Sequence, residues 1–256
     1  MTPGMRSASP VTDRQVRFAH LLRHGVLSGA VAGLSAALVL WLVVEPVVRR
    51  ALAVEQARDQ HGHAHEELVS RGQQVLGGLL TASVVGVLFG VVFAVVFART
   101  RHRLPGRSEQ GRALVLAAMG FAVVVLLPAV TVPANPPAVG DPATVTRRTL
   151  LYVLTILVGL LVVGLLLEVD RRLGERVRRP AVRRTLVVLL AAAAVVVVLA
   201  AMPAPDPIPA DVPADLVWDF RLASLAQLAV MWGVLGLGFG LLVDRETSAP
   251  REPVPG

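Results

Sequence analysis

Three histidines stand at alternate positions in one short polar segment, and two glutamates follow them directly. The set is His61, His63, His65, Glu66 and Glu67. Imidazole nitrogens and carboxylate oxygens are ligands of divalent Co, Ni, Zn and Cu. In a helix His61 and His65 would share a face, whereas in an extended segment all three histidines would align. The pattern leaves two alternatives open: capture of a divalent metal ion, or a solvated polar loop.

Further oxygen ligands lie in other segments between the apolar stretches. These entrance candidates are Glu45, Glu55, Asn135, Asp141, Asp215 and Asp219. Prolines stiffen the segment 133–142 and leave its carbonyl groups unpaired, so it is either the lining of an entrance or a plain turn between two helices. The simpler interpretation of Glu45 and Glu55, which follow the first apolar stretch, is anchoring at the water interface. Trp218, beside Asp219, is typical of an interfacial aromatic belt.

Six apolar stretches must position these loops. Hydrophobic residues make up 54% of the 256 residues and the mean hydropathy is +0.65, which excludes an ordinary water-soluble surface. An uncharged stretch of about 18 residues covers a hydrocarbon core of roughly 30 Å. The stretches are residues 25–44, 75–97, 113–130, 150–167, 185–202 and 222–243. They are apolar on every face, so we predict an all-α, polytopic transmembrane helix bundle of about six spans, the third and fifth being the weakest.

The arginines are divided unequally between the two ends of these spans. Of the 25 basic residues, all of them arginine, eighteen lie in the leader, the second and fourth loops and the tail, and seven lie in the other three loops. Positive residues near span ends stay on the cytoplasmic side. We therefore predict a multi-pass protein of the cell membrane with both termini in the cytoplasm. Ten of the 18 acidic residues lie in the three outer loops, which gives that side a net negative charge able to attract cations.

Several classes of protein are disfavoured by what the chain lacks. It has no cysteine, and so no disulfide or thiolate ligand. Its spans contain no pair of carboxylates, and no zinc-protease motif or activated nucleophile is visible, so we predict no enzyme and no catalytic residue. The arginines form no continuous patch, which argues against nucleic acid as a partner. We expect a disordered cytoplasmic leader over residues 1–20, a membrane domain over 21–245 and a cytoplasmic tail over 246–256.

Glycines recur at four-residue spacing in three of the spans. They are Gly25, Gly29, Gly33, Gly86, Gly90, Gly236 and Gly240. GxxxG spacing lets helix backbones approach closely, so these glycines predict close helix packing and offer faces for an oligomer in the lipid bilayer.

Several loop motifs of this chain resemble the CbtA family of predicted cobalt transporters, over residues 21–245. They are Glu45-Pro46, residues 70–73 (SRGQ), 133–144 (PANPPAVGDPAT), 148–152 (RTLLY), 213–218 (PADLVW), 220–225 (FRLASL) and 238–240 (GFG). The string PANPPAVGDP is long and unusual in composition and carries most weight. The resemblance implies about five spans and a role in cobalt uptake for cobalamin biosynthesis. It also implies a small, single-span, histidine-containing partner of the CbtB type.

The leading hypothesis is therefore a membrane subunit of a divalent metal uptake transporter. The transported ion would be Co²⁺, with Ni²⁺ as the other possibility, and the outer His, Asp and Glu groups would collect it. The chain has no phosphate-binding loop of the Gly-x4-Gly-Lys-Ser/Thr type, so an ATP-driven step would need another chain. The alternative is a membrane scaffold that binds a partner without transporting anything.

Overall fold

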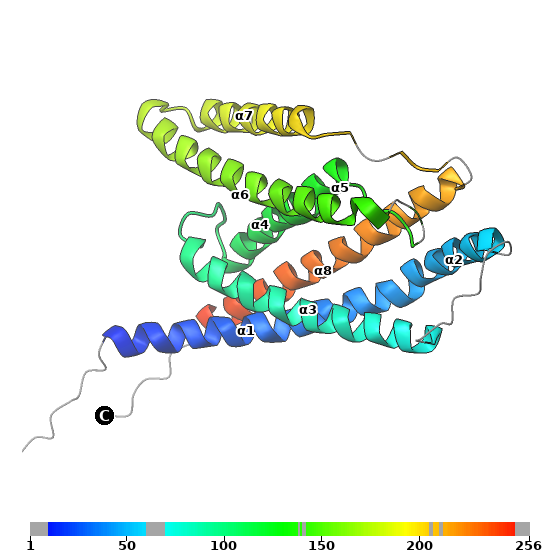
Figure 1. The fold of residues 1–256 in the computed structure, drawn as a ribbon. Helices are drawn as coiled ribbons and strands as arrows, with labels where there is room; N and C mark the ends of the chain where they lie inside the picture. The colour runs from blue at the N-terminus through cyan, green and yellow to red at the C-terminus, as the bar shows by residue number, and fades with distance from the viewer. Residues whose placement is uncertain are drawn as a thin grey trace, which may run out of the picture. The chain divides into compact units, whose positions relative to one another are not determined.

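The computed structural model describes residues 10–59, 70–137, 139, 142–204, 207–209 and 212–248. Within these residues all regular structure is helical, so the predicted all-α fold is confirmed (Figure 1). The elements are α1 (Pro10–Val39), η1 (Leu40–Val44), α2 (Glu45–Asp59), α3 (Arg71–Thr100), α4 (Glu109–Phe121), η2 (Ala122–Leu126), α5 (Leu127–Thr131), η3 (Pro142–Thr144), α6 (Val145–Arg176), α7 (Pro180–Ala201) and α8 (Ala214–Ser248).

Six helical segments of the described chain are long and apolar enough to cross a membrane. They are Phe18–Ala57, Gly72–Thr100, Glu109–Thr131, Val145–Arg176, Pro180–Ala201 and Ala214–Glu246. Each overlaps one of the six predicted stretches, so the predicted polytopic helix bundle is confirmed, and the third and fifth segments are also long and apolar enough to span. The number is one more than the resemblance alone implies.

The N-terminal helix begins earlier than the sequence suggested. The helix α1 starts at Pro10, so residues 10–20 are helical, whereas a disordered leader was expected over residues 1–20. Proline is well suited to the first turn of a helix, because its fixed φ is helical and its missing N–H would have had no partner there. Residues 1–9 lie outside the described part of the chain.

The first span does not close at Glu45 and Pro46, which corrects the prediction. The helix continues from α1 through the π-helical turn η1 into α2, and the Glu45 N–H donates to the Leu40 carbonyl five residues earlier. A proline ring clashes with the carbonyl four residues before it, and widening the helix by one residue relieves that conflict. Glu45 is consequently buried inside a helix, with 7% of its surface exposed, and Glu55 belongs to α2 rather than to a loop.

The third span repeats this arrangement. The π-helical turn η2 ends with the Leu127 N–H donating to the Ala122 carbonyl, and Pro128 follows at the second position of α5. Both π-helical turns thus stand directly before an X-Pro pair. The two prolines are the sequence signal that marks them.

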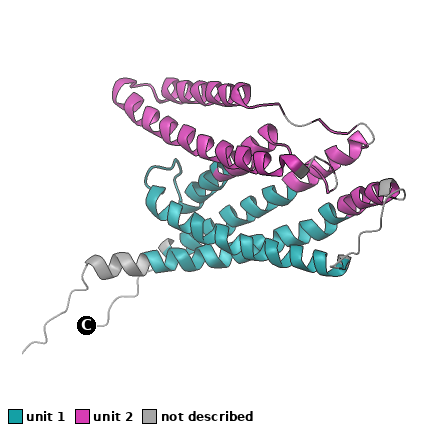
Figure 2. Ribbon diagram, in the orientation of Figure 1, with its two compact units in different colours: residues 1–45, 65–119, 226–256 teal, residues 46–64, 120–225 magenta. Residues whose placement is uncertain are grey.

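The chain forms two compact units, each built from segments far apart in the sequence (Figure 2). Unit 1 consists of residues 1–45, 65–119 and 226–256, and unit 2 of residues 46–64 and 120–225. The helix α8 contributes its first part to unit 2 and its remainder to unit 1. Each unit is described by itself below.

Glycines hold α1 against α3 in unit 1. A Cβ atom added to Gly90 would collide with the Gly25 carbonyl oxygen and would lie 2.8 Å from the Gly29 Cα, and one added to Gly29 would lie 2.5 Å from the Gly86 carbonyl oxygen. No larger residue fits where two backbones approach so closely. The close packing predicted for these glycines is confirmed, and it occurs between helices of one chain.

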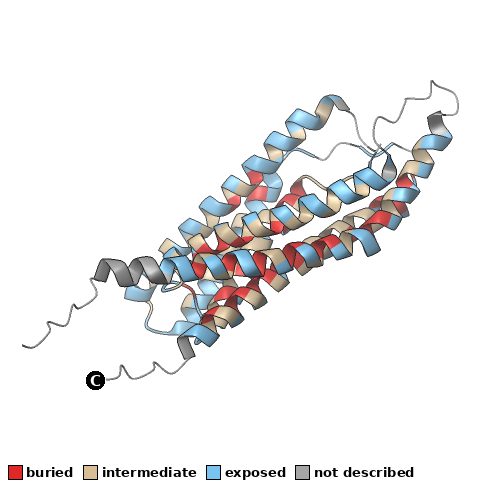
Figure 3. Cartoon of the chain, turned by 90° about the horizontal axis from the view of Figure 1, so that it is seen from below, coloured by how far each residue is buried: buried red, intermediate tan, exposed pale blue. Residues whose placement is uncertain are grey.

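Aromatic side chains complete the core of unit 1. Phe93 and Phe97 of α3 meet Phe239 of α8 edge to face, with ring centroids 5.2 and 5.0 Å away, and Phe97 and Phe239 are fully buried. Beside them Gly240 of α8 packs on α4, where an added Cβ would lie 2.8 Å from the Gln110 Cα. Figure 3 shows buried residues along one side of these helices and exposed residues along the other. The exposed sides carry many large apolar side chains, as expected of surfaces that face lipid.

In unit 2, small side chains allow the third and fourth spans to pack closely. Gly159 of α6 lies against η2, where an added Cβ would be 2.9 Å from a Val123 methyl carbon. The hydroxyl groups of Thr131 and Thr155 are 3.3 Å apart, and Thr155 is completely buried. Hydroxyl groups buried in an apolar bundle need hydrogen-bond partners. The Thr155 hydroxyl donates to the Leu151 carbonyl over 2.8 Å, which leaves its oxygen free to accept from the Thr131 hydroxyl.

Candidate functional site

The predicted metal segment lies outside the described residues, and so does Asp141. This applies to all five members of the set: His61, His63, His65, Glu66 and Glu67. The helix that follows begins with a capping box, in which the Ser70 N–H donates to the Gln73 Oε1 over 3.0 Å and the Ser70 hydroxyl accepts from the Gln73 N–H. Within the described residues no group of three or more His, Asp and Glu side chains is arranged to hold a metal ion.

Two of the predicted entrance carboxylates meet in unit 2 and share one arginine. The Arg50 guanidinium of α2 donates from Nη1 to the Asp219 Oδ2 over 2.7 Å and from Nη2 to the Asp215 Oδ2 over 2.9 Å. The three side chains are 44 to 70% exposed, so water screens the pairs. Sequence reasoning missed Arg50 because it placed this residue in a loop rather than on a helix. The shared arginine partly neutralises the negative charge expected of the two aspartates.

Asn135, another entrance candidate, is bound to an arginine at the start of α8. Arg221 donates from Nε to the Ala134 carbonyl over 3.0 Å and from Nη2 to the Asn135 Oδ1 over 3.1 Å. This fork ties the proline-rich segment to α8 within unit 2. Arg147 and Arg148 of α6 line the same small pocket. Three guanidinium groups therefore line this pocket. The sequence had suggested that the surrounding loops attract cations, whereas this pocket is positively charged.

A cavity lies among α1, η1, α3 and α8 within unit 1. Most of its lining is apolar, Met231 included, and its polar side chains are Thr81 and Gln227. Gln227 and Met231 are one helical turn apart on α8, so both side chains reach the same side. Leu40, the first residue of the π-helical turn η1, closes another part of the wall. Polar groups inside an apolar bundle are costly and commonly mark a pathway for a solute.

A second ionic cluster in unit 1 joins the N-terminal half of α1 to the last turn of α8. The Glu246 carboxylate contacts the Nδ1 atoms of His20 and His24, the latter at 3.6 Å. Asp244 accepts from the N–H of Glu109 over 2.9 Å and thereby caps α4. The spacing of His20 and His24 by four residues is a signal that sequence reasoning left unused.

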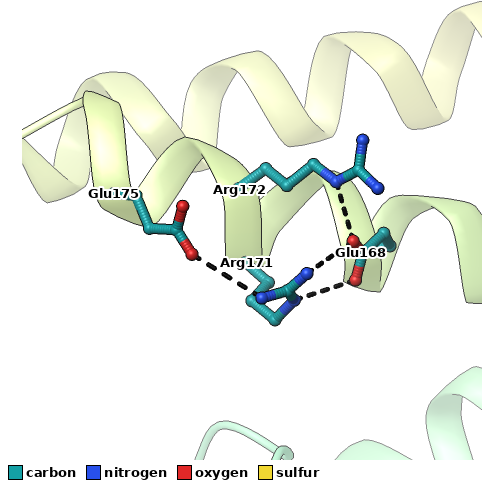
Figure 4. A network of polar contacts seen from close by, with 4 residues as sticks. All are labelled: Glu168, Arg171, Arg172 and Glu175. Atoms are coloured by element: carbon teal, nitrogen blue, oxygen red, sulfur yellow. Dashed lines mark hydrogen bonds and ion pairs between the residues drawn. The ribbon is translucent and has the colours of Figure 1, made fainter.

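The last turns of α6 carry charge pairs formed within one helix (Figure 4). The Arg171 guanidinium contacts Glu168 at 2.7 and 2.9 Å and Glu175 at 3.6 Å, and the Arg172 Nε donates to Glu168 over 2.7 Å. Pairs spaced by three or four residues stabilise the helix that carries them. Local helix stabilisation is therefore a sufficient account of this network.

Comparison with known protein families gives one match that covers most of the chain. The family described as "Probable cobalt transporter subunit (CbtA)" matches residues 18–244. The chain belongs to the CbtA family. No curated protein and no solved structure matches it. The resemblance read from the loop motifs is thus confirmed, together with a membrane location and a link to cobalt transport. A transporter subunit of this kind is not an enzyme.

The CbtA motifs coincide with contacts that build the fold. Glu45 and Pro46 follow the π-helical turn η1, and Ser70 and Gln73 form the capping box of α3. In unit 2, the hydroxyl group of Tyr152 donates to the Val124 carbonyl over 3.2 Å. These motif residues contact other parts of the chain, so the structure gives them a role in the fold. It does not give them a role in binding the ion.

Proposed function

We propose that this protein is the membrane subunit of a Co²⁺ uptake transporter, with Ni²⁺ as a second possible substrate. The observation that carries the proposal is the match to the CbtA family over residues 18–244. Six helices of the described chain that are long and apolar enough to span support a role as the part that crosses the membrane.

Capture of the ion is assigned to the outer loops. His61, His63 and His65 supply neutral imidazole, and Glu66 and Glu67 supply carboxylate oxygens. Of the entrance candidates, Glu55, Asp141, Asp215 and Asp219 are assigned to the entrance, whereas Glu45 is buried within its helix and Asn135 lines the arginine-rich pocket. Arg50 already pairs with Asp215 and Asp219, so these two carboxylates would act at the entrance as a partly neutralised set that holds a passing cation weakly.

The passage is assigned to the cavity in unit 1. A divalent ion loses part of its water shell in an apolar bundle, and the Thr81 hydroxyl and Gln227 amide offer replacement oxygens there. A conduit needs weak, exchangeable ligands, because an ion held too tightly does not leave. The neutral lining of this cavity fits that requirement better than a set of charged ligands would.

Further subunits are assigned to the outward faces of the bundle. The glycines expected to offer faces for an oligomer are already packed against helices of their own chain. A small CbtB-like partner, or a second copy, would therefore be expected on an outward face such as that of α7, where large apolar residues are exposed. Cobalt accumulation by cells that express this chain with and without such a partner tests the role. Accumulation in neither case would favour the alternative of a non-transporting scaffold.

The capture step is tested by replacing His61, His63 and His65 with alanine together. We expect cobalt uptake to fall at limiting external cobalt and to be nearly unchanged at high cobalt, since a capture site raises the local concentration without being the conduit. Wild-type uptake at limiting cobalt should also fall as the external pH drops through about 6.5, because imidazolium does not bind metal ions.

The matched control is His102→Ala, which changes a histidine in the segment that joins α3 to α4. We expect it to behave as wild type at every cobalt concentration. If the triple variant also behaves as wild type at limiting cobalt, the histidine segment takes no part in capture.

Orientation requires its own experiment, since we propose a cell-membrane protein with both termini in the cytoplasm. The chain contains no cysteine, so a single Ala64→Cys substitution gives a unique label. We expect a membrane-impermeant maleimide to label it in intact cells. Labelling that occurs only after permeabilisation would reverse the assignment of the two sides.

A further inference from the structure

A positively charged pocket in unit 2 has no role in the proposed capture of a cation. Arg147, Arg148 and Arg221 all line it, and no acidic residue does so in the described chain. A hydrated divalent cation would be repelled by three guanidinium groups. The pocket therefore fits an anionic group.

The partners of Arg221 leave its positive charge in place. Its two recorded hydrogen bonds go to the Ala134 carbonyl and the Asn135 amide oxygen, which are both neutral. The nearest acidic residues along α8, Asp215 and Asp219, are bound to Arg50 instead. Arg148 has no hydrogen-bond or ion-pair partner within the described residues. Within the described residues, Arg148 and Arg221 thus keep positive charges that an incoming oxyanion would neutralise.

The position of two of these arginines on α6 adds to this charge. Arg147 and Arg148 lie in the first turn of a 32-residue helix, and that turn contains no acidic residue. The free N–H groups of a helix start favour anions and disfavour cations. An anion bound among these side chains would therefore interact favourably with both the guanidinium groups and the helix start.

An apolar groove adjoins the charged pocket. Ile208, Val212, Val217 and Trp218 line this groove, and Arg221 lines it as well as the charged pocket. Trp218 is 61% exposed, so its ring is available to a ligand. A molecule that fills both spaces must carry an anionic group at one end and an apolar chain at the other.

We propose that Arg147, Arg148 and Arg221 bind the phosphate group of an anionic phospholipid, one of whose acyl chains lies in the groove beside Trp218. Guanidinium groups bind phosphate oxygens through paired, charge-assisted hydrogen bonds. The pocket lies where α6 and α8 begin, at the end of two spans, which is where lipid headgroups are found.

The test measures how brominated lipids quench the fluorescence of Trp218 in the purified, delipidated full chain. Trp41→Phe removes the other exposed tryptophan, and Trp232 is buried. We expect phosphatidylglycerol with brominated acyl chains to quench saturably. Arg148→Gln should raise the half-saturating concentration about tenfold, the loss of roughly one charge-assisted hydrogen bond. Because Arg148 has no partner in the described chain, this variant is expected to fold, unlike Arg221→Gln, which also releases the proline-rich segment.

Three controls decide the outcome. Arg178→Gln changes an exposed arginine between α6 and α7 and should leave the quenching unchanged. Brominated diacylglycerol, which lacks phosphate, should quench weakly; quenching as strong as that by phosphatidylglycerol would overturn the proposal. Inorganic phosphate should compete only at much higher concentration. If inorganic phosphate binds the protein while phosphatidylglycerol does not, the ligand is a free anion and the lipid assignment is wrong. Equal half-saturation in wild type and Arg148→Gln would likewise refute it.

Discussion

The hydroxyl group of Tyr152 on α6 donates a hydrogen bond to the backbone carbonyl of Val124 in the π-helical turn η2, over 3.2 Å. Pro128, four residues after Val124, has no N–H to offer that carbonyl. A carbonyl without a donor is costly inside an apolar bundle. Tyr152 thus binds that carbonyl from a neighbouring helix, in a turn where Pro128 leaves the α-helical donor position without an N–H.

A double-mutant cycle tests this compensation. We expect Tyr152→Phe to lower the free energy of unfolding by about 1 kcal/mol, because one hydrogen bond is lost and the carbonyl is left unsatisfied. In a Pro128→Ala background the same change should cost less, since the alanine introduced there has an N–H of its own. Thermal unfolding in detergent measures all four proteins. Equal costs in the two backgrounds would show that the tyrosine and the proline are not coupled.

The sequence predicted the spans, but it did not predict the hydrogen bond between Tyr152 and Val124. Apolar length alone sets where a helix crosses a membrane, so residues 75–97 and 222–243 predicted their helices directly. A contact such as Tyr152 with Val124, or Arg50 with Asp219, depends on how separate helices pack, which hydropathy does not encode. Pro46 was misread for a related reason: near a span end proline usually marks a boundary, but here a π-helical turn accommodates it within the helix.

The glycine contact between α1 and α3 predicts strong sensitivity to a single methyl group. Gly90→Ala would place its Cβ against the Gly25 carbonyl oxygen and the Gly29 Cα, so the two helices must separate. Overpacking of this kind costs roughly 1–3 kcal/mol, and we expect a clear fall in melting temperature.

Gly164→Ala is the matched control, since an added Cβ at Gly164 of α6 meets nothing within 4 Å. Alanine also has the higher helix propensity, so this variant should melt at or slightly above the wild-type temperature. If both variants melted alike, α1 and α3 would not be packed through their glycines.

The shared arginine of unit 2 predicts a rescue by charge exchange. Arg50→Glu would bring a third carboxylate beside Asp215 and Asp219, and we expect the melting temperature to fall by a few degrees. Adding Asp219→Arg restores an opposite-charge pair at the same position and should recover most of the loss. Because the pairs are exposed, the whole effect should shrink in high salt. Failure of the double variant to recover would mean that Arg50 and Asp219 are not neighbours.

The cavity in unit 1 predicts that filling it blocks transport. Gly78 of α3 lines this cavity, and an added Cβ there would meet only the Leu40 side chain at an ordinary 3.4 Å. Gly78→Leu therefore directs its side chain into open space, and we expect the protein to fold while cobalt uptake falls to near background. Gln227→Leu, which removes an amide oxygen but leaves the volume, should reduce uptake less.

Gly77→Leu provides the comparison, because Gly77 precedes Gly78 on the same helix, does not line the cavity and has nothing within 4 Å of an added Cβ. The same leucine is thereby placed one residue away, pointing about 100° around the helix. Uptake by this variant should match wild type once each value is divided by the amount of protein in the membrane. Equal uptake by the Gly77 and Gly78 variants would exclude the cavity as the path of the ion, whereas equal loss in both would trace the effect to α3 itself.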